Sequence, residues 1–231
     1  MDSCKNGIVD LSSLEPLRQS SGAPDYPGRL IAVEGLDGSG KSTQIRRLAE
    51  ALSERGIEVV TTREPGGTEG AEAIRGLLMS GGQDKWNDAT EALLFAAARA
   101  DHVAKLIRPS VTVGKWVLCD RFVDSTRAYQ GGAGGISDAD ILDLHRVGSG
   151  GLLPDRTIVL DLPVEEGARR AAARSAETDR MGAKGADYYN RVAARFRDLA
   201  ALEPERFRLI DANGSPEAVT ARILDALADL F

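Results

Sequence analysis

The sequence predicts an α/β protein with a mostly parallel sheet and helices on both of its faces. From residue 29 onward, short apolar runs typical of buried strands alternate with segments of helical periodicity. Glycine-rich or charged motifs follow the first three runs, where parallel sheets of this kind bind their ligands. The length of 231 residues suits a single domain, and 42% hydrophobic and 28% charged residues are ordinary values for a globular protein.

The predicted elements follow from these patterns in order. Strands are expected at residues 30–33, 58–62, 116–119, 157–161 and 207–210. Helices are expected at residues 41–55, 69–79 and 88–107, then from Ser137 onward and after Ser215 and Pro216. Gly56 and Pro109 are expected to end the first and third helices, and residues 131–135 to form a glycine-rich loop. The expected architecture is therefore a five-stranded parallel sheet flanked by helices.

The N-terminal segment differs in composition from the rest of the chain. Its Ser, Pro and Gly clusters predict a flexible extension at residues 1–28, ahead of one domain at residues 29–231. The net charge of −6 argues against nucleic acid or a membrane surface as partner. Cys4 and Cys119 are too few for a disulfide framework or a zinc site, and no signal peptide or membrane span is evident. The expected location is the cytoplasm.

The first strand leads into a phosphate-binding motif. Gly35, Gly40, Lys41 and Ser42 match the spacing G-x-x-x-x-G-K-[S/T] between a predicted strand and a predicted helix. Such a turn directs backbone N–H groups and a helix N-terminus at phosphate oxygens, and the lysine adds a positive charge. The alternative is a glycine-rich turn without a ligand. The motif predicts a P-loop NTPase fold. The residues expected to bind the phosphates of ATP are Gly35, Leu36, Asp37, Gly38, Ser39, Gly40, Lys41, Ser42 and Thr43.

A carboxylate at the end of the third strand completes a predicted Mg²⁺ site. Asp120 follows the apolar run 116–119, as a Walker-B-type carboxylate does, and the Ser42 hydroxyl of the P-loop is a second metal ligand. A strand-terminating Asp in a turn is the alternative. Arg121 beside it favours the metal site, because a carboxylate next to a guanidinium suits both a metal and a second phosphate.

Two arginines at strand ends predict a clamp for the phosphate of a second substrate. Arg63 follows the second strand and precedes Pro65, Gly66 and Gly67, which permit close approach of the backbone to a ligand. Arg121 occupies the corresponding place after the third strand. A solvated surface arginine is the alternative at Arg63. Lys41, Arg63, Asp120 and Arg121 are thus catalytic candidates.

The chain resembles the thymidylate kinase family, of the kind without arginine in the P-loop. The resemblance spans residues 29–231 and depends on residues 35–43, 62–68 (TREPGGT), 94–99 (LFAAAR) and 120–131. It implies transfer of a phosphoryl group from ATP to dTMP, giving dTDP for dTTP biosynthesis, with Mg²⁺. It also implies a homodimer, to which the Ala- and Leu-rich helix at residues 88–107 is one contributor.

The resemblance also implies the dTMP contacts. Phe95 and Arg99 are four residues apart on one helical face, and in the family the phenylalanine stacks on thymine while the arginine hydrogen-bonds it. From the residues alone, a core phenylalanine and a surface arginine would be favoured. Arg63 and Arg121 match the acceptor-phosphate positions, Asp37 the carboxylate near the 3′-hydroxyl, Thr126 and Gln130 the base pocket, and Tyr129 a position near C2′, where it could instead be packing.

The segment at residues 167–189 is predicted to be a lid. Arg169, Arg170, Arg174 and Arg180 are followed by glycines, and an arginine-rich, glycine-hinged loop can close over a P-loop and bring positive charge to the transferring phosphoryl group. A solvated helix face is the alternative. Because other kinases of the family place an arginine where this chain has Gly38 and Ser39, the lid is expected to supply that charge through Arg174 and Arg180.

Two rival functions remain open. One is a kinase for another nucleoside or nucleoside monophosphate. The other is a switch that hydrolyses ATP or GTP, although no Asn-Lys-x-Asp guanine motif is present and a switch has little use for two arginines at strand ends. His102 and His145 are predicted on helix surfaces and receive no role.

Overall fold

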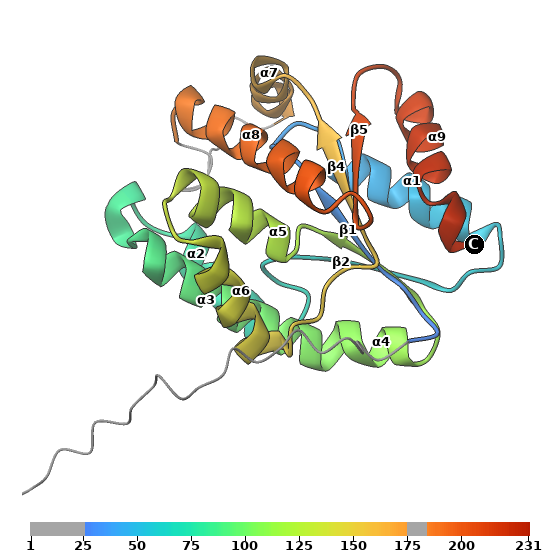
Figure 1. Cartoon of the computed structure of the whole chain (residues 1–231), viewed down its shortest axis with the longest axis horizontal. Helices are drawn as coiled ribbons and strands as arrows, with labels where there is room; N and C mark the ends of the chain where they lie inside the picture. Colours follow the sequence, from blue (N-terminus) through green and yellow to red (C-terminus); the bar gives the residue numbers. More distant parts are fainter. Residues whose placement is uncertain (1–25, 175–183) are drawn as a thin grey trace, which may run out of the picture.

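The protein is built on a five-stranded parallel sheet. We describe residues 26–174 and 184–231 of a computed structural model of the chain. The strands are β1 (Leu30–Glu34), β2 (Val59–Arg63), β3 (Trp116–Asp120), β4 (Arg156–Asp161) and β5 (Phe207–Asp211). Their order is β2-β3-β1-β4-β5, and every neighbouring pair is parallel (Figure 1). The sequence-based prediction of the sheet is confirmed. The predicted flexible extension lies almost wholly outside the described residues.

The central strand β1 is buried on both faces. Ile31 and Val33 pack in one apolar cluster with α1 (Lys41–Ser53) and α9 (Pro216–Ala226). Leu30 and Ala32 belong to a second cluster, formed with the helices on the opposite face. Because successive side chains of a strand point to opposite faces, burial on both sides explains the apolar run from Leu30 to Val33. Helices therefore cover both faces of the sheet, as Figure 1 shows.

Several of the helices begin at residues that cap their first turn. The remaining helices are α2 (Glu69–Met79), α3 (Asp88–His102), α4 (Arg108–Thr112), α5 (Val123–Thr126), α6 (Asp138–Ser149), α7 (Val164–Arg174) and α8 (Ala186–Leu202), with short 3₁₀ turns at Gln83–Lys85 and Ala228–Leu230. The side chains of Thr68, Asn87, Ser137 and Ser215 each accept a hydrogen bond from the backbone N–H three residues later. These bonds satisfy donors that the first turn leaves without a helical partner.

The predicted helix end at Pro109 is wrong. A π-helical turn, Val103–Ile107, follows α3 and leads directly into α4, with Pro109 in the first turn of α4. The N–H of Arg108 donates to the carbonyl of Val103, five residues back. Because the wider turn shifts the hydrogen-bond pattern, a proline without an N–H fits here without breaking the helix.

The predicted loop at residues 131–135 is also partly wrong. The π-helical segment Arg127–Ala133 continues α5, so Gly131 and Gly132 are helical. This segment packs against α8, where the Tyr188 hydroxyl donates to the carbonyl of Tyr129 at 3.1 Å. Burial against a neighbouring helix outweighs the poor helix propensity of glycine, which a local pattern does not reveal.

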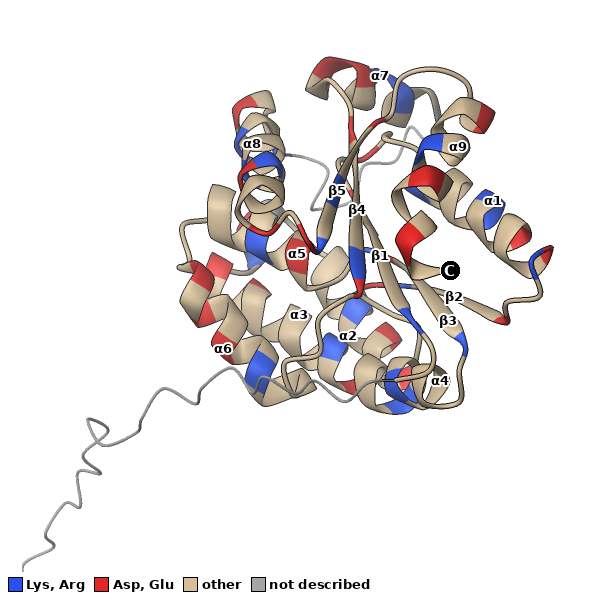
Figure 2. Cartoon of the chain, turned by 45° about the vertical axis from the view of Figure 1, so that its right-hand side comes forward, with Lys and Arg blue, Asp and Glu red and all other residues tan. Residues whose placement is uncertain are grey.

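The carboxyl ends of β1, β2 and β3 meet at one edge of the sheet. In the strand register Asp120 lies opposite both Val33 and Arg63. The P-loop therefore emerges beside Arg63 and Asp120. Lys and Arg alternate with Asp and Glu over the helices (Figure 2). Among the described helices, none combines the length and apolar character that crossing a lipid bilayer requires.

Candidate active site

The P-loop has the backbone geometry of a phosphate cradle. Gly38 and Gly40 have φ angles of 79° and 99°, a region that residues with a Cβ rarely adopt. Helix α1 begins at Lys41 and has no side-chain cap at its N-terminus. Its first N–H groups thus point into the turn, where an anion can accept them. The buried Ser39 hydroxyl has no hydrogen-bond partner in the described structure, which a phosphate oxygen would supply.

Lys41 lies inside this turn and bonds to the turn itself. Its ammonium donates to the carbonyls of Gly35 at 3.1 Å and Leu36 at 3.0 Å, and it lies 3.8 Å from the Asp37 carboxylate. Burial lowers the pKa of Lys41 to about 8, and the positive charge of Arg121 acts in the same direction. A phosphate would offset both effects, because it brings negative charge to a buried cation.

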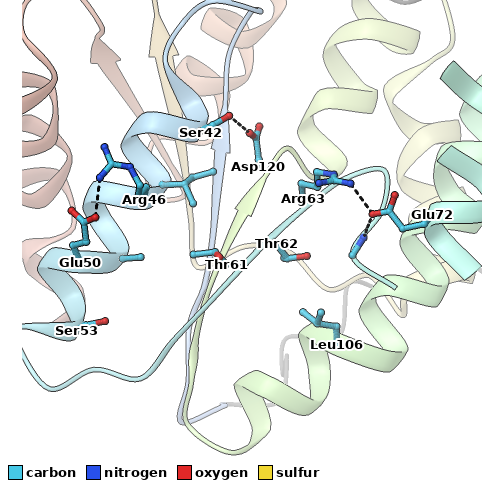
Figure 3. A pocket seen from close by; sticks show the side chains of 13 residues that line it. Ser42, Arg46, Glu50, Ser53, Thr61, Thr62, Arg63, Glu72, Leu106 and Asp120 are labelled. Carbon is cyan, nitrogen blue, oxygen red and sulfur yellow. Dashed lines mark hydrogen bonds and ion pairs between the residues drawn. The ribbon is translucent and has the colours of Figure 1, made fainter. Parts of the chain in front are cut away.

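A groove at the carboxyl edge of the sheet is lined by residues of α1, β2, β3 and α2, and Ser42 and Asp120 lie side by side in it (Figure 3). The Ser42 hydroxyl donates to Asp120 Oδ2 at 3.2 Å. A hydroxyl and a carboxylate are hard oxygen ligands, and Mg²⁺ in nucleotide sites uses one or two such groups together with phosphate oxygens. The donor set therefore fits Mg²⁺.

Arg63 reaches into the same groove from β2. Its guanidinium donates to Glu72 of α2 at 3.0 Å, and Glu72 also accepts the N–H of Gly67 (Figure 3). The Arg63 side chain is 56% exposed, so it lies at the surface but has a specific partner. Glu72 was not predicted, because no local pattern in α2 singles it out.

Arg121 faces a second hollow on the other side of the strand end. It has a φ angle of 68°, and its guanidinium donates to Asp37 at 2.8 Å and to the carbonyl of Gly35 at 3.2 Å. The same guanidinium contacts Ser125 at 3.2 Å and the Tyr129 hydroxyl at 3.3 Å. Arg63 and Arg121, predicted as one clamp, thus line two hollows separated by the end of β3.

Glu34, at the end of β1, accepts hydrogen bonds from the residues that follow Arg121. Its carboxylate accepts the N–H groups of Phe122 at 2.7 Å and Ser125 at 3.1 Å, and the Ser125 hydroxyl at 2.5 Å. Burial raises the pKa of Glu34 to about 7, against the opposing effect of the Arg121 charge. The sequence analysis missed this residue, although a carboxylate within an apolar strand is a signal that it needs a buried partner.

The second hollow contains most of the predicted dTMP contacts. Of the eight residues predicted to contact dTMP, seven line it: Asp37, Phe95, Arg99, Arg121, Thr126, Tyr129 and Gln130. Arg63 is the exception, since it lines the groove of Figure 3. The hollow is also lined by Glu64, Pro65, Arg75, Met79, Phe122 and Ser125, which were not predicted to contact dTMP.

Arg99 is fixed in the wall of this hollow. Its side chain is 3% exposed, its Nε donates to Glu64 at 2.7 Å, and its Nη2 donates to Thr126 at 3.0 Å and to the carbonyl of Phe122 at 3.2 Å. The alternative of a surface arginine is wrong. Because a guanidinium is rigid and planar, these three bonds also fix the direction of its remaining N–H groups.

Gln130 and Tyr129 close the hollow on the side of α8. Gln130 donates to the buried Glu91 carboxylate at 3.1 Å. The Tyr129 ring packs edge-on against Phe196 of α8, and burial raises the pKa of its hydroxyl to about 12. Tyr129 is therefore neutral at physiological pH, and its contacts combine packing with a bond to Arg121.

The predicted lid is helical at residues 167–174 and 186–189, whereas residues 184 and 185 are not. Residues 167–174 belong to α7, so the glycine-hinged loop does not begin at Gly167. Arg169 and Arg170 both pair with Glu166. Arg174 is the last residue of α7, and Arg180 lies outside the described residues.

Helix α7 touches the P-loop through two glycines. A Cβ atom on Gly38 would overlap the carbonyl oxygen of Gly167, and a Cβ on Gly167 would lie 2.9 Å from the Asp37 carbonyl oxygen. The two backbones are thus in direct contact, because neither residue has a side chain.

The prediction that both histidines lie on helix surfaces is wrong. His102 is 0% exposed and His145 is 2% exposed. His145 donates through Nε2 to the carbonyl of Leu152 at 2.7 Å, while its Nδ1 has no partner in the described structure. Helical periodicity did not separate these positions from surface ones, since histidine is common on both.

A P-loop beside a hydroxyl and a carboxylate that fit a metal ion, next to a second hollow lined by an aromatic ring and arginines, is the arrangement of a nucleotide phosphotransferase. The family model for thymidylate kinase matches residues 33–223. The chain therefore belongs to the thymidylate kinase family, whose members are nucleoside monophosphate kinases.

Individual relatives agree with the family model. A thymidylate kinase of Rhizorhabdus wittichii is 58% identical over 206 residues, which cover 89% of this chain and 99% of the relative. One of Caulobacter vibrioides is 48% identical over 200 residues, covering 87% and 96%. The crystal structure of thymidylate kinase from Ehrlichia chaffeensis has a TM-score of 0.72 at 35% identity, covering 87% of this chain and 98% of that one.

Proposed function

We propose that this protein transfers the γ-phosphoryl group of ATP to dTMP, giving dTDP and ADP for dTTP biosynthesis. The observation that supports this most directly is the hollow that joins Phe95 and Arg99 to Arg121, next to the P-loop. An aromatic ring and a donor-only side chain suit a base with carbonyl acceptors, and a guanidinium beyond them suits its phosphate. Phe95 stacks on the thymine in this proposal, and Arg99, Thr126 and Gln130 bond its edge.

The reaction needs no general base. A phosphate oxygen of dTMP attacks the γ-phosphorus, the bond from that phosphorus to the bridging oxygen breaks, and ADP leaves with the electron pair. The second pKa of a phosphate monoester is about 6, so the attacking oxygen carries no proton at neutral pH. The work of the protein is to bring two anions into line.

Each charged residue has a part in this alignment. Lys41 and the N–H groups of the P-loop bind the ATP phosphates. Arg121 binds the acceptor phosphate, and Arg63 joins it from the neighbouring groove by exchanging Glu72 for that phosphate. Asp37 accepts the 3′-hydroxyl of the sugar, and the ring of Tyr129 fills the space next to C2′. Ser42 and Asp120 would hold Mg²⁺, which neutralises negative charge on the transferring phosphates when bound.

The lid would supply the remaining positive charge. The P-loop has no arginine between Gly35 and Thr43, so the proposed subtype relies on Arg174 and Arg180 at the transferring phosphoryl group. The position of α7 against Gly38 supports this, since it brings the start of the lid onto the P-loop. The division of the chain into an extension and one domain, and its cytoplasmic location, stay predictions.

We also propose a homodimer through the face formed by α2, α3 and α6. These helices pack side by side (Figure 1), and each exposes a large apolar residue: Leu77 at 47%, Leu93 at 55% and Val147 at 76%. Exposed apolar residues on neighbouring helices are a common feature of interfaces. Sedimentation of the protein should give a dimer mass, and Leu93→Lys should shift it toward the monomer. A monomeric wild-type protein at micromolar concentration would contradict the proposal.

An ADP-release assay across a panel of acceptors tests the proposed function. We expect turnover with dTMP to exceed clearly that with dCMP, dGMP and thymidine. Comparable rates with dCMP would favour a kinase of another specificity. ATP binding with no phosphoryl transfer to any nucleotide would favour a switch.

A further inference from the structure

His102 is a buried polar residue for which the proposed reaction has no use. It is the last residue of α3, one turn after Arg99, and its side chain is 0% exposed. Both ring nitrogens have partners, with Thr62 Oγ1 2.8 Å from Nε2 and Glu64 Oε1 3.1 Å from Nδ1. An imidazole buried with two specific partners is a positioned group, because packing alone does not need its nitrogens.

Glu64 connects this histidine to the acceptor hollow. One carboxylate oxygen, Oε1, faces His102, and the other, Oε2, accepts from Arg99 Nε at 2.7 Å. A carboxylate only accepts hydrogen bonds, so Nδ1 of His102 is the donor in this contact. With both oxygens bonded, the Glu64 carboxylate cannot rotate, and it fixes the plane of the Arg99 guanidinium.

The position of Gly67 shows how closely this arrangement is built. A Cβ atom on Gly67 would lie 2.6 Å from His102 Nε2 and 2.5 Å from Thr62 Oγ1. The turn after β2 therefore folds directly over the imidazole. Thr62 and Gly67 line the groove of Figure 3, whereas Glu64 and Arg99 line the acceptor hollow, so His102 lies between the two.

We propose that His102 is a positioning residue for base recognition: by donating to Glu64 it holds the Arg99 guanidinium in the orientation that bonds thymine. The proposal rests on the proposed function, since it assumes that Arg99 contacts the base. Thymine presents a carbonyl where cytosine presents an amino group, and a donor-only guanidinium favours the carbonyl. Loss of the His102 contact should therefore weaken both dTMP binding and its preference over dCMP.

Two substitutions separate the two nitrogens of His102. The amide nitrogen of His102→Asn lies near the position of Nδ1 and can still donate to Glu64. The amide of His102→Gln extends toward the position of Nε2 and Thr62 instead. We expect His102→Asn to keep the KM for dTMP within about threefold, and His102→Gln to raise it about tenfold, with the dTMP-to-dCMP preference falling in parallel. The KM for ATP should change little in either variant.

A purely structural role predicts the opposite order. Glutamine is closer than asparagine to histidine in size, so packing alone would make His102→Gln the milder change. An equal effect of the two substitutions, a milder effect of His102→Gln, or a parallel rise in the KM for ATP would each overturn the proposal. Thr62→Val is the matched control, because it removes the partner of Nε2 and leaves Glu64 untouched. Its KM for dTMP should stay within about threefold of wild type.

A spectroscopic measurement keeps the proposal testable if His102→Asn does not fold. The Nε–H of Arg99, buried against Glu64, should give a slowly exchanging signal in nitrogen–proton NMR spectra of the wild-type protein. This signal should broaden or vanish in His102→Gln, and its retention would contradict the proposal. Arg99→Met tests the base contact of Arg99 separately from the role of His102. An unchanged KM for dTMP in Arg99→Met contradicts the proposed base contact itself, whereas a large rise together with wild-type behaviour of both His102 variants contradicts the role of His102 alone.

Discussion

The acceptor hollow and the P-loop groove differ in what their charged side chains contact. Arg99 in the hollow is 3% exposed and bonded to three acceptors that do not belong to any substrate. In the P-loop, Lys41 bonds the carbonyls of its own turn, and in the adjoining groove Arg63 pairs with Glu72; a phosphate would replace these contacts. Recognition of the base is thus built into the fold, while recognition of phosphate requires charged groups to change partners.

This difference divides the expected effects of mutation. Changes at the base-binding residues of the hollow should alter the KM for dTMP and the choice of base, because they disturb a preformed shape. Changes among the phosphate contacts should alter turnover, because those contacts strengthen as charge develops on the transferring group.

Arg121→Ala should lower kcat about a thousandfold and leave ATP binding nearly intact. Arg121 holds the attacking phosphate in line with the γ-phosphorus, and loss of an arginine from a phosphoryl-transfer site costs about this much. Steady-state kinetics and calorimetric titration with ATP measure the two quantities. Arg222→Ala removes the same charge from α9, where Arg222 bonds the carbonyls of Asp211 and Asn213, and is the control. Near-normal turnover in Arg121→Ala would refute the assignment of Arg121.

Acidification should destabilise the fold around the acceptor hollow, because His145 becomes protonated. Burial lowers the pKa of His145 to about 4, below its usual 6.5, and a proton on Nδ1 would find no acceptor there. The unfolded chain then binds this proton more readily than the folded one. The stability that neutral His145 provides above pH 6.5 is therefore lost as the pH falls toward 4, by about 2–3 kcal/mol.

Urea unfolding between pH 7 and pH 4.5 measures this loss, and His145→Asn should remove most of it. Because the His145 ring packs edge-on against Phe122, which lines the acceptor hollow, the KM for dTMP should rise before the KM for ATP does. The same pH dependence in His145→Asn would assign the effect to other groups.

Phe95→Ala should raise the KM for dTMP about twentyfold and change the KM for ATP little. Stacking of a base on an aromatic ring contributes about 1–3 kcal/mol, and the loss is confined to the hollow. Phe95→Tyr keeps the ring and should stay close to wild type. If both KM values rise together in Phe95→Ala, the two halves of the site are not independent.

Ser125→Ala should have the smallest effect, a fall in kcat of about threefold. Its hydroxyl bridges Glu34 and Arg121, and its loss leaves the two N–H bonds to Glu34 in place. The expected change is in kcat because the orientation of Arg121 is altered. A change in the KM for dTMP alone would instead assign Ser125 to the residues that recognise the base.

Local patterns in the sequence predicted much of this molecule. The five strands, the P-loop and the order of motifs along the sheet edge depend on residues close together in the chain, as do the caps at Ser137 and Ser215. The π-helical turns were missed because Pro109 and the glycines near 131 are accommodated by tertiary packing. The roles of Glu34, Glu72 and His102 were missed for a related reason, since most of their partners lie in other elements of the fold.

The contact between Gly38 and Gly167 also limits which side chains this protein can carry at position 38. The space that a side chain at position 38 would fill is taken by the backbone of α7. An arginine at position 38 would have to displace α7. A guanidinium group can therefore approach the phosphates either from the P-loop or from the lid, because the two would occupy the same space. Grafting an arginine onto this turn would require redesign of the lid as well.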